Sequence, residues 1–238
     1  MNCMRLYVNY KEEMTSMSKI KIGWGEETLV PEGLKVSLAG QFFERISQYV
    51  ESEITATAMA VEADGDEMII VSADMTGIND YLMSIIRERF TAICKDFDAN
   101  KIIVSATHTH NSHTIVSGKK DEGFEWLSER ILGEFMPEGK NYKKLVKADE
   151  NVISAESATV FVAEQIALAA KKAWESREEA YYTNEFGRAA VGMCRRVCYD
   201  DGSAQMWGDA DTANFTALEG GNDSGVELIY TFDKNKKL

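Results

Sequence analysis

The feature of this 238-residue sequence that most constrains its fold is an apolar strand, an amphipathic helix and a second apolar strand in close succession. The strands are expected over Met68–Ala73 and Lys101–Thr107, and the helix over Asp80–Phe97. Apolar residues recur along the helix at three- and four-residue spacing, as one stripe: Leu82, Ile85, Ile86, Phe90, Ile93 and Phe97. Such a crossover is nearly always right-handed and leaves its two strands parallel. The unit therefore predicts an α/β fold.

The two parallel strands end in residues that can carry chemistry. The first is followed by Asp74 and the second by His108. Because parallel strands end at the same edge of a sheet, the carboxylate and the imidazole should emerge together. Ligands of open α/β sheets bind in the crevice beyond the carboxyl ends of the strands. We therefore expect a metal or proton-transfer site at this edge, although Asp74 could instead serve as a turn or helix-entry residue.

The remaining elements complete the predicted sheet. An alternating strand at Ile54–Glu62 joins Met68–Val71 through Asp64-Gly65, a typical hairpin signal. The longest helix is expected over Ser154–Glu178, and it should pack across the sheet. Three strand-like pieces follow it, with an Asp-Gly turn between the first two: Ala189–Val197, Ala204–Trp207 and Val226–Phe232. The fold class expected is α/β: a mixed sheet with a parallel strand-helix-strand core and helices packed on its faces.

Domain organisation can be predicted from the polar, irregular and glycine-rich segments of the sequence. Residues 1–18 are polar and irregular, and we expect a disordered extension there, with a single α/β domain over 19–238. Residues 116–151 are polar and rich in glycine, which suggests either a mobile flap beside the site or a surface insertion. The last residues, Asp233–Leu238, look like a hairpin turn without its returning strand. We therefore expect the chain to be the amino-terminal part of a longer hydrolase.

The composition of the chain argues against nucleic acid as a binding partner and against a membrane-spanning segment. The formal charge of −13 repels nucleic acid, and the basic residues form no stripe with interleaved aromatics. No stretch approaches the ~20 apolar residues of a membrane span, and no secretory signal is seen, so a cytoplasmic location without an integral membrane segment is expected. The four cysteines lack metal-binding spacing, and we expect them to be reduced structural thiols.

All three histidines fall within six positions, at His108, His110 and His113. Neutral imidazole is a common ligand of zinc, and two histidines separated by one residue of extended chain project to the same side. This spacing makes metal binding the first hypothesis, with His108 and His110 placed to converge and His113 as a further candidate. A purely structural reading stays open, in which the rings cap a strand end and bond nearby carbonyls.

Several motifs occur in the order found in one known family. They are Pro31-Glu32-Gly33, Leu38-Ala39-Gly40 with Arg45, Ala58-Met59-Ala60, Val71-Ser72-Ala73-Asp74, Ser105-Ala106-Thr107-His108-Thr109-His110 and, more weakly, Gly192-Met193-Cys194-Arg195-Arg196. In these the chain resembles the amino-terminal domain of the neutral/alkaline, non-lysosomal ceramidases and their bacterial relatives. The resemblance runs from Ile22 to about Asp233.

This resemblance implies a zinc-dependent amidohydrolase that cleaves an N-acyl amide, which in the best-known members is the lipid ceramide. It assigns His108 as a zinc ligand and places His110 in the same site. We assign His110 and Asp74 as catalytic candidates, with Asp74 orienting an imidazole or taking a proton from water. The family's other ligands, a His, a Glu and a Tyr, and its catalytic serine lie later in the chain. This sequence has no histidine after His113, so an incomplete site with little turnover is expected.

Two other functions fit parts of the pattern. A metallo-β-lactamase-like hydrolase has the signature His-x-His-x-Asp-His, which matches the spacing of His108, His110 and His113, but Ser112 stands where that signature has its acid. A non-catalytic binding domain that kept the fold and its histidines is the other alternative. Metal content and its dependence on His108 would separate these readings.

Overall fold

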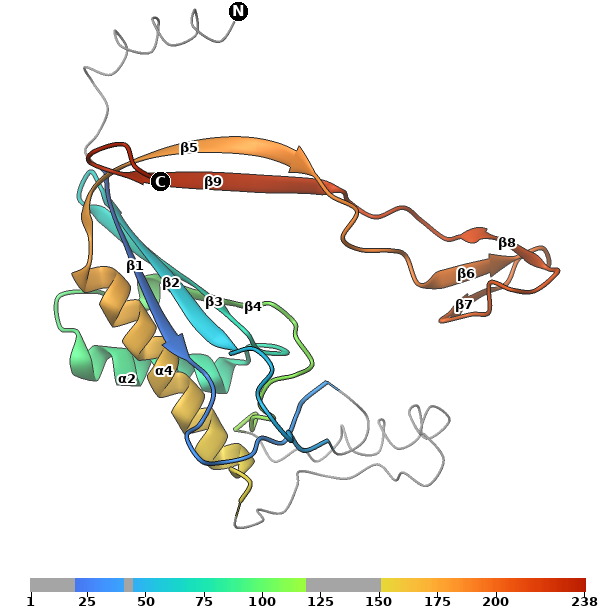
Figure 1. The fold of residues 1–238 in the computed structure, drawn as a ribbon, viewed down its shortest axis with the longest axis horizontal. Helices are drawn as coiled ribbons and strands as arrows, with labels where there is room; N and C mark the ends of the chain where they lie inside the picture. Colours follow the sequence, from blue (N-terminus) through green and yellow to red (C-terminus); the bar gives the residue numbers. More distant parts are fainter. Residues whose placement is uncertain (1–19, 41–44, 119–150) are drawn as a thin grey trace, which may run out of the picture. The chain divides into compact units, whose positions relative to one another are not determined.

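The computed structural model describes residues 20–40, 45–118 and 151–238 (Figure 1). One sheet has six strands in the order β4-β3-β2-β1-β5-β9, and a second has three in the order β7-β6-β8. The larger sheet comprises β1 (Ile20–Thr28), β2 (Thr55–Ala63), β3 (Asp66–Ala73), β4 (Ile102–Ala106), β5 (Glu178–Arg188) and β9 (Gly225–Asp233). The smaller comprises β6 (Arg196–Tyr199), β7 (Ala204–Met206) and β8 (Phe215–Leu218). The helices are α2 (Asp80–Ile93), the short η2 (Ala99–Lys101) and α4 (Ala155–Glu175).

The expected fold class is confirmed. The large sheet is mixed, with the single parallel pair β3–β4 among antiparallel neighbours, and α4 packs against β1, β2 and β3. The described chain divides into two compact units, and the boundary in the sequence falls within β5, between Ala180 and Tyr181. The expected boundaries, a disordered extension over 1–18 and one domain over 19–238, stay a prediction. The expected extension and most of the expected flap lie outside the described residues.

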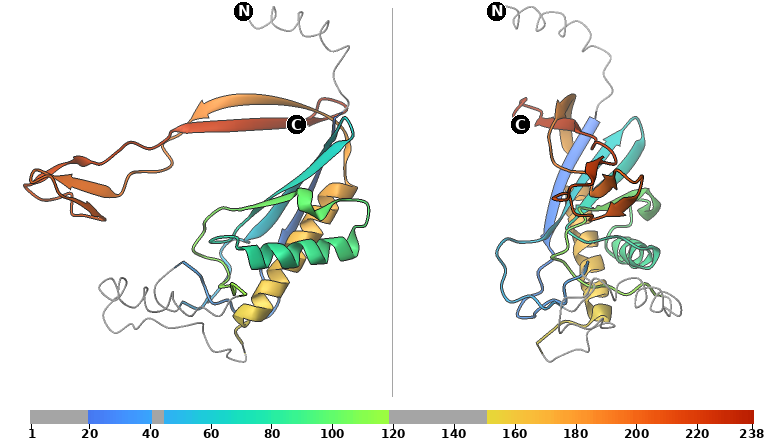
Figure 2. Two further views of the ribbon diagram at one scale, coloured as in Figure 1. Left: turned by 180° about the vertical axis from the view of Figure 1, so that it is seen from behind. Right: turned by 90° about the vertical axis from the view of Figure 1, so that its right-hand side faces the viewer.

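The strand-helix-strand unit forms as expected (Figure 2). Strands β3 and β4 run parallel from the pair Ile69–Ile102 to the pair Ala73–Ala106. Helix α2 begins after Asn79, whose side chain accepts a hydrogen bond from the backbone N–H of Leu82. These contacts bring the two strand ends to the same edge of the sheet.

Helix α2 ends at Ile93, four residues before the predicted end at Phe97. Cys94 adopts an extended backbone, and the chain then turns back toward the sheet. Phe97 still reaches the core, where its ring meets the rings of Phe90 and Trp174 at centroid distances of 5.6 and 4.7 Å. The apolar pattern thus identified a buried residue correctly but assigned it to the wrong element, because a loop residue can fill the core as well as a helical one.

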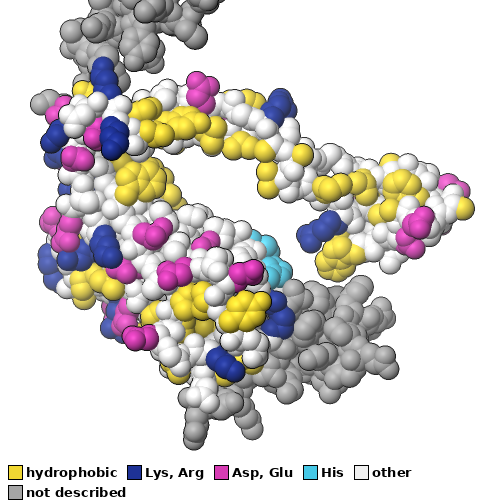
Figure 3. All heavy atoms as spheres, in the orientation of Figure 1, with side chains coloured by type: hydrophobic (Ala, Val, Ile, Leu, Met, Phe, Trp, Pro, Cys, Tyr) yellow, Lys and Arg dark blue, Asp and Glu magenta, His cyan; other side chains and the backbone are white. Residues whose placement is uncertain are grey.

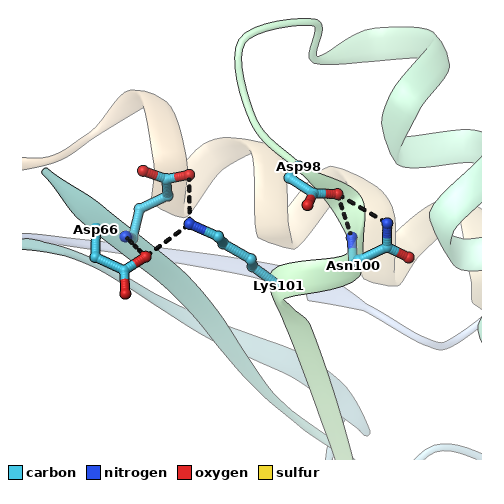
Figure 4. Close-up of polar contacts among 5 residues, drawn as sticks. Asp66, Asp98, Asn100 and Lys101 are labelled. Atoms are coloured by element: carbon cyan, nitrogen blue, oxygen red, sulfur yellow. Dashed lines mark hydrogen bonds and ion pairs between the residues drawn. The ribbon is translucent and has the colours of Figure 1, made fainter.

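A polar junction fixes the start of β4 (Figure 4). Lys101 donates to Asp66 over 2.6 Å and to Glu67 over 3.1 Å, at the start of β3. These contacts lower the pKa of Asp66 and raise the pKa of Lys101. Asp98 accepts from the backbone and side chain of Asn100 and so caps η2. The junction lies next to Ile69–Ile102, the first pair of the parallel strands.

The hairpin between β2 and β3 also forms as predicted. Ala63 pairs with Asp66, which leaves Asp64 and Gly65 as a two-residue loop. Both loop residues have positive φ, at 53° and 82°. This is the backbone of the tight hairpin turn that Asp-Gly favours.

Small residues let α4 lie directly on the sheet. Gly23 and Gly25 of β1 face the helix, and a Cβ on either would lie 2.2–2.3 Å from a carbonyl oxygen of α4. Ala56, Ala58 and Ala60 of β2 are fully buried on the same face. On the helix, the buried small residues are Ala158, Ala163, Ala167, Ala169, Ala170 and Ala173. Because the side chains at this contact are small, the backbones of α4 and the sheet can approach each other closely.

The second unit differs more from the sequence expectation. The strand expected over Ala189–Val197 forms only at its end, as the start of β6, while β7 and β9 lie where strands were predicted. Strands β5 and β8 were not predicted, and neither was β1 of the first unit. Their sequences are polar or interrupted, and they form strands because neighbouring strands supply hydrogen-bond partners.

No helix within the described residues is long and apolar enough to cross a membrane.

Candidate functional site

Asp74 and Thr107 join the carboxyl ends of β3 and β4. The hydroxyl of Thr107 donates to Asp74 Oδ1 over 3.0 Å, and the backbone N–H of Thr55 donates to Oδ2 over 2.9 Å. The N–H of Thr107 also donates to the carbonyl of Ala73. The Asp74 carboxylate is therefore held at the sheet edge where the sequence placed it, beside the segment that carries the histidines.

His108 leaves β4 through an unusual backbone conformation. Its φ is +62°, in the left-handed region that non-glycine residues adopt at a cost of about 1–3 kcal/mol. Its ring Nδ1 lies 2.6 Å from the carbonyl oxygen of Thr76. Because a carbonyl only accepts, Nδ1 carries the proton, and a neutral ring then has its lone pair at Nε2. The turn and this hydrogen bond together orient His108, and the orienting acceptor is Thr76 rather than Asp74.

His110 comes back toward His108. The two Nε2 atoms lie 3.4 Å apart, and the rings meet edge to face with centroids 5.0 Å apart. His108 is exposed and His110 is half-buried, and imidazole atoms reach the molecular surface in Figure 3. The expectation that these two rings converge is therefore met, although the backbone between them is irregular and not a strand.

Arg45 and Gly40, from the first part of the chain, lie against His110. The guanidinium of Arg45 donates to the carbonyl of His110, and also to Asn111 Oδ1 over 3.3 Å and to the carbonyl of Ala39 over 3.4 Å. Gly40 has φ +89°, and a Cβ there would lie 2.3 Å from Cγ of His110. A side chain at position 40 would therefore collide with the imidazole.

His113 is directed into the protein interior. It is 1% exposed, and its Nε2 donates to the carbonyl of Leu29 over 2.6 Å. Burial lowers the pKa of its imidazole, and Nδ1 is buried without a hydrogen-bond partner. The neighbouring Ser112 is fully buried against Met75. The structure thus brings His108 and His110 together and places His113 elsewhere as an anchor of the loop.

The two Nε2 atoms suit a shared metal ion. At zinc–nitrogen distances of about 2.0–2.1 Å, two ligands of a tetrahedral ion are about 3.3 Å apart. The observed 3.4 Å and the proton on His108 Nδ1 match that requirement. Among residues 20–40, 45–118 and 151–238, no group of three or more His, Cys, Asp or Glu side chains could hold a metal. The described residues therefore offer these two imidazoles as candidate ligands and no third one beside them.

Two contributors to this arrangement were not given roles by sequence reasoning. Thr76 bonds His108 through its carbonyl, and its hydroxyl donates to the carbonyl of Thr109 over 2.9 Å. Arg45 was noted for its position in a motif, not for its contact with His110. Backbone carbonyls carry no residue-specific signal, and Arg45 is 65 positions away from His110, so neither contact could be read from local pattern.

The fold and the site together define an α/β protein with a paired-histidine loop beyond parallel strand ends. Comparison with solved structures shows that this is a ceramidase-like fold. The crystal structure of neutral ceramidase from Pseudomonas aeruginosa matches with a TM-score of 0.62 and 15% identity, over 94% of this chain and 31% of that one. A ceramidase complexed with C2 matches with a TM-score of 0.59 and 15% identity, over 93% and 30%. The chain thus spans less than a third of those proteins. Family models and curated proteins give no match.

Proposed function

We propose that this chain carries the histidine pair of a zinc-dependent amidohydrolase that acts on an N-acyl amide with a lipid-like acyl chain. The observation that supports the proposal most is the 3.4 Å separation of the Nε2 atoms of His108 and His110, with His108 Nδ1 bonded to Thr76. The ceramidase-like fold supports the same reaction class. A shell of two histidines is incomplete, so the proposal includes further ligands from polypeptide outside the described residues.

The roles of the residues follow from their contacts. His108 and His110 would hold the ion, and Thr76 fixes the tautomer of His108 through its carbonyl. Bound zinc supplies a water of pKa about 7 and polarises the amide carbonyl. Asp74, held by Thr107 and Thr55, would accept the proton of the attacking water. In the overall reaction a C–O bond forms and the amide C–N bond breaks, giving a carboxylate and an amine.

The two alternatives receive different support. The metallo-β-lactamase-like reading needs His113 beside the other two histidines, and His113 instead donates to the buried carbonyl of Leu29. A non-catalytic binding domain is compatible with the fold and with an incomplete ligand set. The experiment must therefore separate zinc binding from hydrolysis.

Zinc binding can be measured on the purified full chain by metal analysis and by competition with a chromophoric chelator. We expect about one zinc per chain, with an affinity that falls at least about tenfold in both His108→Ala and His110→Ala. His113→Gln is the matched control, because glutamine keeps an N–H donor for Leu29 and should leave the affinity unchanged. Zinc binding that survives both alanine substitutions would overturn the metal assignment.

Hydrolysis is tested with a panel of N-acyl amides and simple esters, with and without chelator. Chelator-sensitive release of a fatty acid from the amides supports the amidohydrolase. A version extended past Leu238 that binds zinc through His108 and His110 but hydrolyses none of these substrates would favour the binding-domain alternative. The two measurements therefore report separately on the metal site and on the reaction.

A further inference from the structure

The surroundings of the buried His113 ring suit a neutral imidazole. Its Nε2 donates to the carbonyl of Leu29, and its ring centroid lies 5.9 Å from that of Phe161. Its Nδ1 is buried without a partner among the described residues. A charged imidazolium does not fit here, because its second N–H would be buried without an acceptor and its charge without a counter-charge.

No charged side chain of the described residues compensates for that burial. The causes of the lowered pKa of His113 are burial first and, in the opposite direction, the hydrogen bond to Leu29, and no charged group is among them. Two of the nearby acids, Glu27 and Glu164, already form ion pairs with basic side chains. The charged residues on the described segments around His113 are Glu26, Glu27, Glu32, Lys35, Arg45, Glu156 and Glu164.

His113 belongs to a short segment, residues 112–114, that fastens the histidine loop to the chain near Leu38. We call residues 112–114 the anchor segment. The bridge of His113 with Leu38 is flanked by two backbone hydrogen bonds of 2.8 Å, one donated by the N–H of Ala39 and one by the N–H of Thr114. If the ring of His113 leaves the interior, the bridge and both hydrogen bonds lose their support.

Ala39 connects the anchor segment to the histidine pair. Its N–H donates to the carbonyl of Ser112, and its carbonyl accepts from the guanidinium of Arg45, which also donates to the carbonyl of His110. The next residue, Gly40, lies against the imidazole of His110. Movement of the anchor segment would therefore reach the backbone that supports His110.

We propose that His113 is a pH-sensitive latch: on taking up a proton it leaves the interior, and the anchor segment detaches while the sheet and α4 stay folded. The direction follows from solvation. An exposed ring binds a proton from about pH 6.5 downward, whereas the buried ring binds it only at lower pH, so weak acid favours the open form. Control of zinc at His108 and His110 by this latch rests on the proposed function, but the latch itself does not.

Amide hydrogen exchange on the full chain without metal tests the latch directly. After correction for the intrinsic pH dependence of exchange, the rates of Ala39 and Thr114 should rise by up to about tenfold for each pH unit below about 6.5. Amides of α4 and β2 should not change. His113→Gln is the matched control, because glutamine keeps a donor for Leu29 but takes up no proton, and it should show no rise.

The ring itself gives an independent readout. The NMR signal of the His113 imidazole, assigned by its loss in His113→Gln, should shift over the pH range in which the two amides open. Corrected amide rates that stay constant from about pH 7.5 to about pH 5 would overturn the proposal. A rise of equal size in His113→Gln would do the same, as would opening of α4 and β2 together with the anchor segment.

A second measurement asks whether the latch reaches the histidine pair. The zinc affinities of the unchanged chain and of His113→Gln should agree at about pH 7.5, whereas at about pH 5.5 the variant should bind at least about threefold more tightly. Both proteins share the protonation of His108 and His110 and differ only in the latch. Equal affinities at both pH values would overturn the control of zinc. Amides that open in a chain without zinc affinity would contradict the proposed function and still support the latch.

Discussion

The hydroxyl of Thr107 donates a hydrogen bond of 3.0 Å to the carboxylate of Asp74, and so joins the ends of two parallel strands by their side chains. The same carboxylate accepts from the N–H of Thr55 at the start of β2. Three strands of the sheet therefore meet at one carboxylate, directly before the loop that carries the histidines.

Replacing Thr107 by valine should remove this link while keeping the shape of the side chain. The variant leaves one oxygen of Asp74 without its donor, and we expect a loss of about 1–2 kcal/mol in the free energy of unfolding, measured by urea denaturation. Thr107→Ser retains the hydroxyl and should recover most of that loss. Equal stabilities for the valine and serine variants would show that the hydrogen bond is not what joins the strand ends.

Alanine at Gly23 should test the close approach of α4 to β1. The added Cβ would lie 2.2 Å from the carbonyl oxygen of Ala173, so helix and strand must separate, at a cost of about 1–3 kcal/mol. Gly77 offers a matched control, since a Cβ there meets nothing within 4 Å. Gly77→Ala should be neutral or slightly stabilising. Thermal denaturation of both variants measures the difference, and similar melting temperatures would contradict the packing argument.

His113 should make stability depend on pH. Burial lowers the pKa of its imidazole below the usual value of about 6.5, so the unfolded chain takes up the proton first as pH falls. Stability should therefore be greatest above about pH 6.5 and decline from there down to the lowered pKa of the folded state. His113→Gln cannot titrate at this position and should show a weaker decline in thermal unfolding between about pH 7.5 and pH 5. An identical decline in both proteins would exclude His113 as its source.

Cys94 should be an inert thiol. Burial, followed by the hydrogen bond to Asp96, raises its pKa to about 11, and Asp96 also accepts from the indole of Trp174 over 3.1 Å. At pH 8 iodoacetamide should therefore modify Cys94 much more slowly than the partly exposed Cys194 and Cys198, as read by peptide mass spectrometry. Asp96→Asn removes the negative charge and should speed the labelling of Cys94. Labelling of all three thiols at the same rate would contradict this environment.

The strand-helix-strand unit was predictable because strong local signals agreed with one another. Two apolar runs and the 3.6-residue periodicity between them all lie within residues 68–107. The pairing of Asp74 with the histidine loop followed from the parallel topology alone. In contrast, β1 and β5 contain glycine, lysine and several acids, and their identity as strands depends on neighbours far along the chain.

The sequence by itself determined the α/β class, the hairpin, α4 and the sheet edge at which Asp74 and His108 emerge, because each of these depends on periodicity, turn chemistry or the handedness of a short crossover. Only the tertiary structure decided which histidines converge. The rings of His108 and His110 are directed toward each other by the positive φ at His108, the carbonyl of Thr76 and the hydrogen bonds of Arg45. His113 instead points into the interior, where it donates to the carbonyl of Leu29. These are contacts between distant segments, many through backbone atoms that are the same in every residue, so local sequence could not specify them.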